Sequence, residues 1–130
     1  MPAKEFERML APAACDERIV AVSVATRPDC IPDDVLKILS DFNKKKKVFV
    51  ELGLQTSNDD TAKLINRGYA LSEYTDAAMR LRRENIETVT HIIIGLPGEN
   101  LTDYIKTVRC ACENTDGVKL QLLHVLRGTK

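Results

Sequence analysis

The chain has 130 residues, 44% of them hydrophobic and 29% charged, which suits one compact soluble domain spanning residues 1–130. Its 19 Lys and Arg residues balance its 19 Asp and Glu residues, so no global charge points to nucleic acid or an anionic membrane. The charged N-terminus lacks the apolar core of a signal peptide, and no apolar run is long enough to cross a bilayer. We therefore expect a cytoplasmic protein with no membrane partner, whose four cysteines are free thiols.

The first third of the sequence predicts a helix, a strand and a second helix. Residues 6–12 have the spacing of a short helix that ends at its Ala-Pro pair. Residues 19–25 are too uniformly apolar for a half-exposed strand and too short for a buried helix, which favours a central parallel strand. Two prolines make 26–32 its exit loop, and the helix over 33–43 ends at lysines 44–47.

The rest of the sequence repeats this alternation of strands and helices. Strands are predicted at 48–56, 88–94 and 118–125. Helices are predicted between them, the first beginning with a capping box at Ser57 and closing at Gly68, followed by 72–83 and by an apolar stripe from Leu101 to Cys112. Together with the first strand, these units predict an α/β fold with about four parallel strands and helices packed against them.

Side chains alternate between the two faces of each predicted strand. One face carries the polar residues, and the other face is apolar; the polar set is Glu51, Gln55, His91, Lys119 and Gln121. A doubly wound sheet would bury both faces under helices, whereas a curved sheet closing around a cavity has a use for polar residues. The pattern thus favours a partial (β/α) barrel with helices on its outer face. The alternative is that Glu51, His91 and Lys119 pair with one another inside a packed barrel.

Several motifs, in this order, resemble a known family. They are Thr26-Arg-Pro-Asp-Cys-Ile-Pro32, Val50-Glu-Leu-Gly-Leu-Gln-Thr56, Leu64-Ile-Asn-Arg-Gly68, His91-Ile-Ile-Ile-Gly-Leu-Pro-Gly-Glu99 and Leu122-Leu-His-Val-Leu-Arg-Gly-Thr129. The set is similar to the second half of a radical S-adenosylmethionine (SAM) enzyme core, and most similar to the YhcC-like branch of iron-sulfur oxidoreductases. The resemblance implies that the chain supplies strands three to six of a six-unit barrel, with SAM lying across the carboxyl ends of the strands.

The resemblance also implies roles for individual residues. Gln55 and Arg67 would contact the methionine part of SAM, and His91 would meet the ribose. Ile93 and the backbone near Leu123 would flank the adenine. The substrate would be held in the barrel mouth by Glu51, Gln121 and His124.

The chain departs from the family pattern in two respects. The CxxxCxxC loop, whose three thiolates hold a four-iron four-sulfur cluster, is missing, as is the glycine-rich stretch expected after strand two. Cys110 and Cys112 cannot replace the loop, because they lie about 200° apart around a predicted helix. We therefore expect a fragment of a larger enzyme, with no catalytic residue or metal ligand of its own and neither SAM nor the cluster bound to the fragment alone.

The resemblance implies that the parent enzyme cleaves SAM reductively and abstracts hydrogen from its substrate. A tRNA nucleoside is one candidate substrate, with 44–47 and Arg80, Arg82 and Arg83 as the contacts, although a lysine run at a helix end is more often a solvated cap. Two alternatives remain open: a non-catalytic binding or assembly module on a barrel scaffold, and a barrel fragment that binds phosphate at 95–98. Exposed strand edges in a partial barrel also predict self-association.

Overall fold

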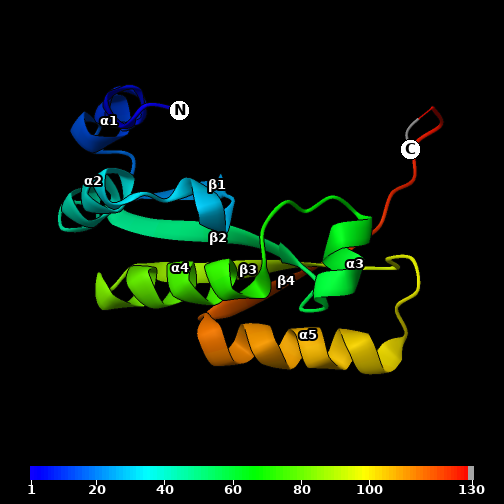
Figure 1. Cartoon of the computed structure of the whole chain (residues 1–130). Coiled ribbons are helices and arrows are strands. Elements are labelled where there is room, and N and C mark those ends of the chain that lie inside the picture. Colours follow the sequence, from blue (N-terminus) through cyan, green and yellow to red (C-terminus); the bar gives the residue numbers. More distant parts are fainter. Residues whose placement is uncertain (129–130) are drawn as a thin grey trace.

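The computed structural model describes residues 1–128, whose strands form a single parallel sheet (Figure 1). The strands pair in the order β1 (Ala21–Thr26), β2 (Lys47–Gln55), β3 (Glu87–Ile94) and β4 (Gly117–Leu122). The helices are α1 (Ala3–Cys15), α2 (Asp33–Asn43), α3 (Asp59–Leu64), α4 (Leu71–Arg83) and α5 (Leu101–Asn114), with a 3₁₀ turn η1 at Pro28–Cys30. Thr129, the end of the last sequence motif, lies outside the described residues.

The strand order identifies the architecture. Strands that follow one another in the sequence are neighbours in the sheet and run parallel, as in a (β/α) barrel. A doubly wound sheet would instead reverse its order at a switch point. The fold is therefore part of a (β/α) barrel, as the sequence predicted.

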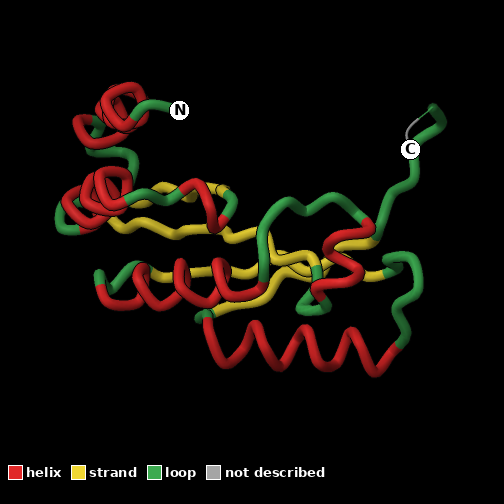
Figure 2. The backbone as a smooth tube through the Cα atoms, viewed as in Figure 1, coloured by secondary structure: helices red, strands yellow, loops and turns green. Residues whose placement is uncertain are grey.

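The helices form a layer on one face of the sheet. Helix α2 packs on β2, α4 packs on β2 and β3, and α5 packs on β3 and β4. Figure 2 shows α4 and α5 side by side along the lower side of the strands, while α1 lies against α2 at the other edge. The opposite face of the sheet carries no helix from the described part of the chain, and its side chains are only partly buried.

Strict alternation along β2 explains why the sheet has two unlike faces. Val48, Val50, Leu52 and Leu54 are fully buried against the helices, and the residues between them are partly exposed. The few buried polar groups on the helix-covered face bond to one another. The Tyr74 hydroxyl lies 2.7 Å from the Thr90 Oγ1, which lies 2.8 Å from the Thr115 Oγ1. This face is thus a closed core without uncompensated polar atoms among the described residues.

Several predicted element ends are wrong: β4 ends at Leu122 and not at 125, α3 ends at Leu64 and not at Gly68, and two further ends have a clear cause. Helix α1 continues past Pro12 to Cys15, because it has no buried residue and the hydrogen bond that proline removes is lost at an exposed surface. Asn58, not Ser57, caps α3, and its side chain accepts from the backbone N–H groups of Asp60 and Thr61. Ser57 instead donates its backbone N–H to the Thr107 Oγ1 of α5, at 3.0 Å. A cap is thus decided by tertiary contacts that spacing does not reveal.

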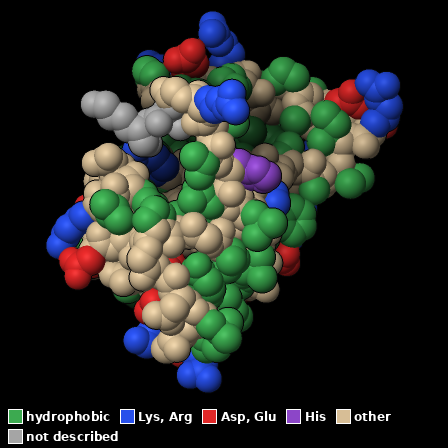
Figure 3. Space-filling view, turned by 90° about the vertical axis from the view of Figure 1, so that its right-hand side faces the viewer, with side chains coloured by type: hydrophobic (Ala, Val, Ile, Leu, Met, Phe, Trp, Pro, Cys, Tyr) green, Lys and Arg blue, Asp and Glu red, His purple; other side chains and the backbone are tan. Residues whose placement is uncertain are grey.

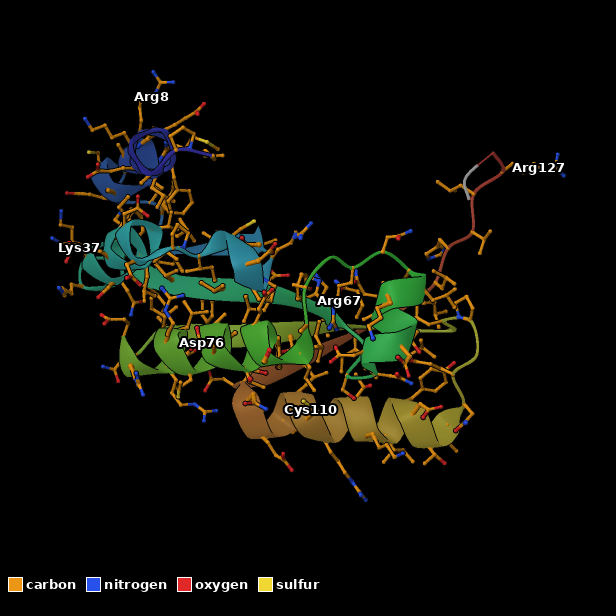
Figure 4. All side chains as sticks on the ribbon, in the orientation of Figure 1. Arg8, Lys37, Arg67, Asp76, Cys110 and Arg127 are labelled. Atoms are coloured by element: carbon orange, nitrogen blue, oxygen red, sulfur yellow. The ribbon has the colours of Figure 1, made fainter. Side chains whose placement is uncertain are left out.

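The inward face of α5 also differs from the predicted stripe. Leu101 and Ile105 are 71% and 43% exposed, while the buried positions carry the small side chains of Thr107 and Ala111. Cys110, labelled in Figure 4, packs against the core, and Cys112 is exposed, the reverse of the prediction. Small residues at the contact let α5 lie close to the sheet and to α4, so apolarity alone indicated the inward face only in part, at the partly buried Tyr104 and Val108.

Strand β4 is an edge strand that leaves apolar side chains uncovered. Leu120 and Leu122 point to the helix-covered face but are 60% and 69% exposed, because no described helix follows β4 to pack on them.

None of the helices within residues 1–128 is long and apolar enough to span a membrane.

Candidate functional site

The backbone of β2 changes course at its carboxyl end. The register with β3 shifts between Gly53 and Gln55, and Gln55 has a φ of +62°, which non-glycine residues rarely adopt. This turn folds the Gln55 side chain back over Gly53. A Cβ added at Gly53 would lie only 2.6 Å from the Gln55 Nε2, so the absence of a side chain at Gly53 makes room for the amide. Backbone strain of this kind gathers at binding sites.

Tyr69, in the segment between α3 and α4, holds the Gln55 amide. Its single hydroxyl proton can be donated to the Gly53 carbonyl oxygen or to the Gln55 Oε1, which lies 3.1 Å away. Burial raises the pKa of Tyr69 to about 12, and the hydroxyl is a donor at neutral pH. The Arg67 and Arg27 guanidinium groups lie over its ring, at 4.7 and 5.4 Å from the centroid. The position of Gln55 is thus fixed by a buried neighbour.

Arg67 is a buried cation at the same end of the sheet, and its side chain is 2% exposed. Its guanidinium donates to three backbone carbonyl oxygens, those of Leu54 (3.1 Å), Thr56 (2.6 Å) and Tyr69 (3.0 Å). The fourth partner is the Asp59 carboxylate, at 2.9 Å. Figure 4 shows Arg67 between the end of β2 and α3. Arg67 therefore clamps the exit of β2 and places a positive charge there.

A cavity of about 360 Å³ opens beside this cluster, and it is lined by the ends of β2 and β3 and by the segments that follow β1, α3, β3 and β4. The lining contains four of the five residues predicted to contact SAM, namely Gln55, Arg67, Ile93 and Leu123. The fifth, His91, lies two residues before Ile93 on the same face of β3. Figure 3 looks at this end of the molecule and shows hydrophobic side chains in a band across the face, with a histidine near its middle.

A row of polar side chains crosses the open face next to this cavity. Glu51 on β2 accepts from the Ser23 Oγ of β1 at 2.7 Å, and its other oxygen lies 2.5 Å from the His91 Nε2 of β3. The Lys119 Nζ of β4 lies 3.4 Å from the same oxygen. The hydrogen bonds from Ser23 and His91 lower the pKa of Glu51 to about 2. Glu51, His91 and Lys119 thus contact one another, as the alternative interpretation of the sequence supposed, but on a face that is open.

The remaining predicted substrate contacts lie on or beyond β4. Gln121 pairs in register with Ile93 of β3 and is exposed, and His124 is exposed in the segment that follows the strand.

The loop after β3 is held in place by Glu99, whose carboxylate accepts from the Thr56 Oγ1 at the end of β2. The loops that surround the cavity are therefore tied to each other.

The cysteines do not form a cluster site. Cys15, Cys30, Cys110 and Cys112 are free thiols on three different elements, and no group of three metal-ligating side chains occurs within residues 1–128. Four-iron four-sulfur clusters need several convergent thiolates. The cysteines of this chain therefore do not fit such a cluster.

Sequence reasoning missed Tyr69 and Arg27 as parts of the site. Both lie in loops far apart in the sequence, and neither belongs to an alternating strand pattern that would indicate its direction. Two signals were available: Arg27 lies in the first of the family-like motifs, and Tyr69 lies two residues after Arg67, next to Gly68.

Comparison with known proteins identifies relatives for nearly the whole chain. The sequence model of the Radical SAM superfamily matches residues 2–111. The uncharacterized protein YtqA of Bacillus subtilis is 41% identical over 97% of this chain, and protein YhcC of Escherichia coli is 38% identical over 90% of it. The chain spans 38% of the length of each of these two relatives.

Two further comparisons concern function and fold. A tRNA uridine(34) acetyltransferase of Dehalococcoides mccartyi is 32% identical over 86% of this chain, which covers 25% of that protein. Among solved structures, coproporphyrinogen III oxidase of Escherichia coli, described as a radical SAM enzyme, superposes on 97% of this chain with a TM-score of 0.81. The chain covers 30% of that structure at 19% sequence identity, so this likeness shows the fold alone.

Proposed function

The chain belongs to the radical SAM superfamily, and we propose that it forms the part of a radical SAM enzyme that holds SAM at the carboxyl ends of its strands. Membership implies SAM and a four-iron four-sulfur cluster in the longer protein. The observation that carries the proposal is the cavity of about 360 Å³ in which Gln55, Arg67, Ile93 and Leu123 converge. Its size suits a nucleoside rather than a macromolecule.

The residues around this cavity fit the parts of SAM. The Gln55 amide supplies a neutral hydrogen-bond donor and acceptor for the polar methionine end. Ile93 and Leu123 supply the apolar surfaces between which an adenine ring lies. Four of the five N–H donors of Arg67 already serve protein acceptors, so its main contributions are its charge and the shape that it gives the cavity wall.

Bound SAM supplies the chemistry of such an enzyme, and this chain supplies its orientation. Tyr69 holds Gln55, Arg67 holds the end of β2, and the apolar lining excludes water from the nucleoside. The four cysteines do not fit the cluster, so we assign no step of the reaction to them. The chain alone is expected to bind SAM weakly and to be catalytically silent.

SAM binding by the unmodified chain and by two of its variants tests this assignment. We expect calorimetry or equilibrium dialysis to find weak, saturable SAM binding to the chain and binding about tenfold weaker in Gln55→Ala, which loses amide hydrogen bonds. The matched control is Gln121→Ala, which removes the same group from β4 and should leave SAM binding unchanged. Equal loss in both variants, or no SAM binding even at millimolar concentration, would contradict the proposal.

We further propose that the longer protein acts on a tRNA nucleoside. Several relatives carry the names of tRNA-modifying enzymes, among them a tRNA-2-methylthio-N(6)-dimethylallyladenosine synthase. The lysine run 44–47 and Arg83 lie near the amino ends of β2 and β3, and Lys47 is roughly 26 Å along β2 from Gln55 at 3.3 Å per residue. Several are already paired: Lys44 with Asp41, Lys47 with Glu87 and Arg80 with Asp33. A tRNA would therefore contact this end with its body while a nucleoside occupies the cavity.

The salt dependence of tRNA binding tests the tRNA proposal. Lys45, whose side chain has no ion pair among those found in residues 1–128, and Arg83 are the positions to neutralise. The double variant should bind tRNA more weakly, and the slope of log affinity against log salt should fall by about two, because each removed cation leaves one phosphate without its neutralising partner. An unchanged slope would exclude this surface.

A second candidate function is assembly through the β4 edge, and the exposed leucines favour it. Leu120 and Leu122 of β4 and Leu101 and Ile105 of α5 are exposed apolar side chains on two elements that pack together, next to an unpaired strand edge. Light scattering should show self-association that Leu120→Lys with Leu122→Lys abolishes. A monomer at high concentration in the unmodified chain would contradict this candidate.

A further inference from the structure

Glu51 joins all four strands of the sheet through side-chain contacts. Its Oε1 accepts from Ser23 of β1 at 2.7 Å, and its Oε2 lies 2.5 Å from the His91 Nε2 of β3 and 3.4 Å from the Lys119 Nζ of β4. The side chain is only 24% exposed. Both carboxylate oxygens therefore have protein partners within residues 1–128.

This arrangement is hard to reconcile with a direct contact to substrate. The sequence places Glu51 among the substrate-facing residues, and a ligand that bound its carboxylate would have to displace Ser23, His91 or Lys119. Each of these partners donates a hydrogen bond, two of them from nitrogen atoms that can carry charge, and such bonds are roughly twice as strong as neutral ones. The pKa of Glu51, lowered to about 2, keeps the carboxylate ionised at neutral pH, so it acts as an acceptor only.

A hydrogen-bond acceptor beside one nitrogen of a neutral imidazole places the proton on that nitrogen and leaves the other nitrogen as an acceptor. Because Glu51 accepts, the His91 Nε2 must carry the proton. Nδ1 of a neutral His91 is then an acceptor, and it is the nitrogen that can contact a ligand. The cross-strand neighbour of His91 on β2 is Gly53, over which the Gln55 amide lies, so His91 is next to the proposed SAM contact Gln55.

We propose that Glu51 is a positioning residue that fixes His91 with its proton on Nε2, so that Nδ1 accepts a hydrogen bond from a hydroxyl group of the ligand. The inference rests on the proposed function for the presence of a nucleoside, whose sugar carries such hydroxyl groups. Ser23 and Lys119 hold the carboxylate from the two outer strands. The orientation of His91 therefore depends on the whole sheet and not on β3 alone.

Nitrogen NMR of the imidazole rings tests the first half of this proposal without any ligand. In the ¹⁵N-labelled chain, well above the ordinary pKa of histidine, His91 should show one tautomer, protonated at Nε2, with slow exchange of that proton. His124, which is exposed, should show averaged signals and fast exchange. Glu51→Gln should shift the His91 signals towards those of His124. Glu87→Gln, which removes another cross-strand carboxylate, paired with Lys47, should leave them unchanged.

Two histidine measurements test the second half, with adenosine as the probe. His91→Gln keeps a polar group near the position of Nε2 and loses Nδ1, so adenosine binding should weaken about tenfold, as expected for the loss of one hydrogen bond. Adenosine should also shift the Nδ1 signal of the unmodified chain, whereas 2′,3′-dideoxyadenosine should not. A His91 that averages its tautomers in the unmodified chain would overturn the proposal, even if Glu51→Gln does not fold.

The two possible failures can be told apart. If adenosine binds nowhere but His91 is locked by Glu51, the proposed SAM site fails and the positioning role of Glu51 stands. If adenosine binds at Ile93 and Leu123 without a response at Nδ1, the SAM site stands and the role of His91 in accepting a hydroxyl hydrogen bond is wrong.

Discussion

The two faces of the sheet are held together in different ways. On the helix-covered face, Leu52, Tyr74 and their neighbours are fully buried, and the few polar groups bond to one another. On the open face, Glu51, His91 and Lys119 form a row of partly exposed polar contacts. The comparison teaches that stability and ligand chemistry are carried by alternate residues of the same strands. Substitutions one position apart should therefore have different effects.

The largest effect should come from the helix-covered face. Leu52→Ala removes a fully buried side chain and leaves a cavity, which should lower the free energy of unfolding by about 2–5 kcal/mol. Gln121→Ala, on the open side of β4, should change it by less than about 0.5 kcal/mol. Urea denaturation followed by circular dichroism measures both. Similar losses in the two variants would remove the distinction between the faces.

Arg67 tests the carboxyl end of β2, where one side chain serves both stability and ligand binding. Arg67→Met keeps much of the buried volume but leaves the Thr56 and Tyr69 carbonyls without the Arg67 donor, so the free energy of unfolding should fall by about 1–3 kcal/mol. SAM binding should weaken as well, because the end of β2 is released. The control is Arg83→Met, an exposed change on α4 that should alter neither property. An Arg67→Met variant of full stability would show that the clamp is not needed.

Gly53 should separate ligand binding from stability. A Cβ at this position would lie 2.6 Å from the Gln55 Nε2, which is the end of a flexible side chain and can move away. Gly53→Ala should therefore weaken SAM binding about tenfold while unfolding changes by less than about 1 kcal/mol. Gly117→Ala, on β4 and farther from the cavity, should leave binding unchanged. Isothermal calorimetry and urea denaturation of both variants give the comparison.

The last effect, which appears only in acid and leaves neutral pH unchanged, should be the pH dependence that Glu51 gives to stability. Its folded pKa of about 2 lies below its ordinary value of 4.5, so its contribution to stability is complete above pH 4.5 and is lost as the pH falls towards 2. Glu51→Gln should thus lose less stability than the unmodified chain between pH 4.5 and 2. The control Asp41→Asn changes a carboxylate of lowered pKa that is 55% exposed and should alter the profile less. Parallel profiles for the unmodified chain and Glu51→Gln would contradict this account.

The sequence revealed the fold because the period of its apolar residues is local information. Buried and partly exposed residues alternate strictly along runs such as 48–55. This alternation determined the strand, its two faces and the face that Glu51 and Gln55 share. Element ends were less predictable, because tertiary contacts decide them, as when Thr107 takes the backbone N–H of Ser57.

The candidate site was predictable only in part, for a similar reason. Gln55, Arg67, Ile93 and Leu123 were identified through a family resemblance, and the cavity brings them together. The buried contacts of Arg67 and the position of Tyr69 depend on how the segment between α3 and α4 folds back onto β2. No periodic pattern specifies that path. The closed network around Glu51 likewise needed coordinates from four strands.

The central claim is that the carboxyl end of this sheet holds the nucleoside part of SAM. Intermolecular nuclear Overhauser effects test it most directly. In a sample of the chain with methyl-labelled Ile and Leu and excess SAM, we predict contacts from the adenine protons to the methyl groups of Ile93 and Leu123. No contact is expected to Leu120, which lies on the other face of the sheet. Adenine contacts confined to other residues, or none with SAM in excess, would contradict the account.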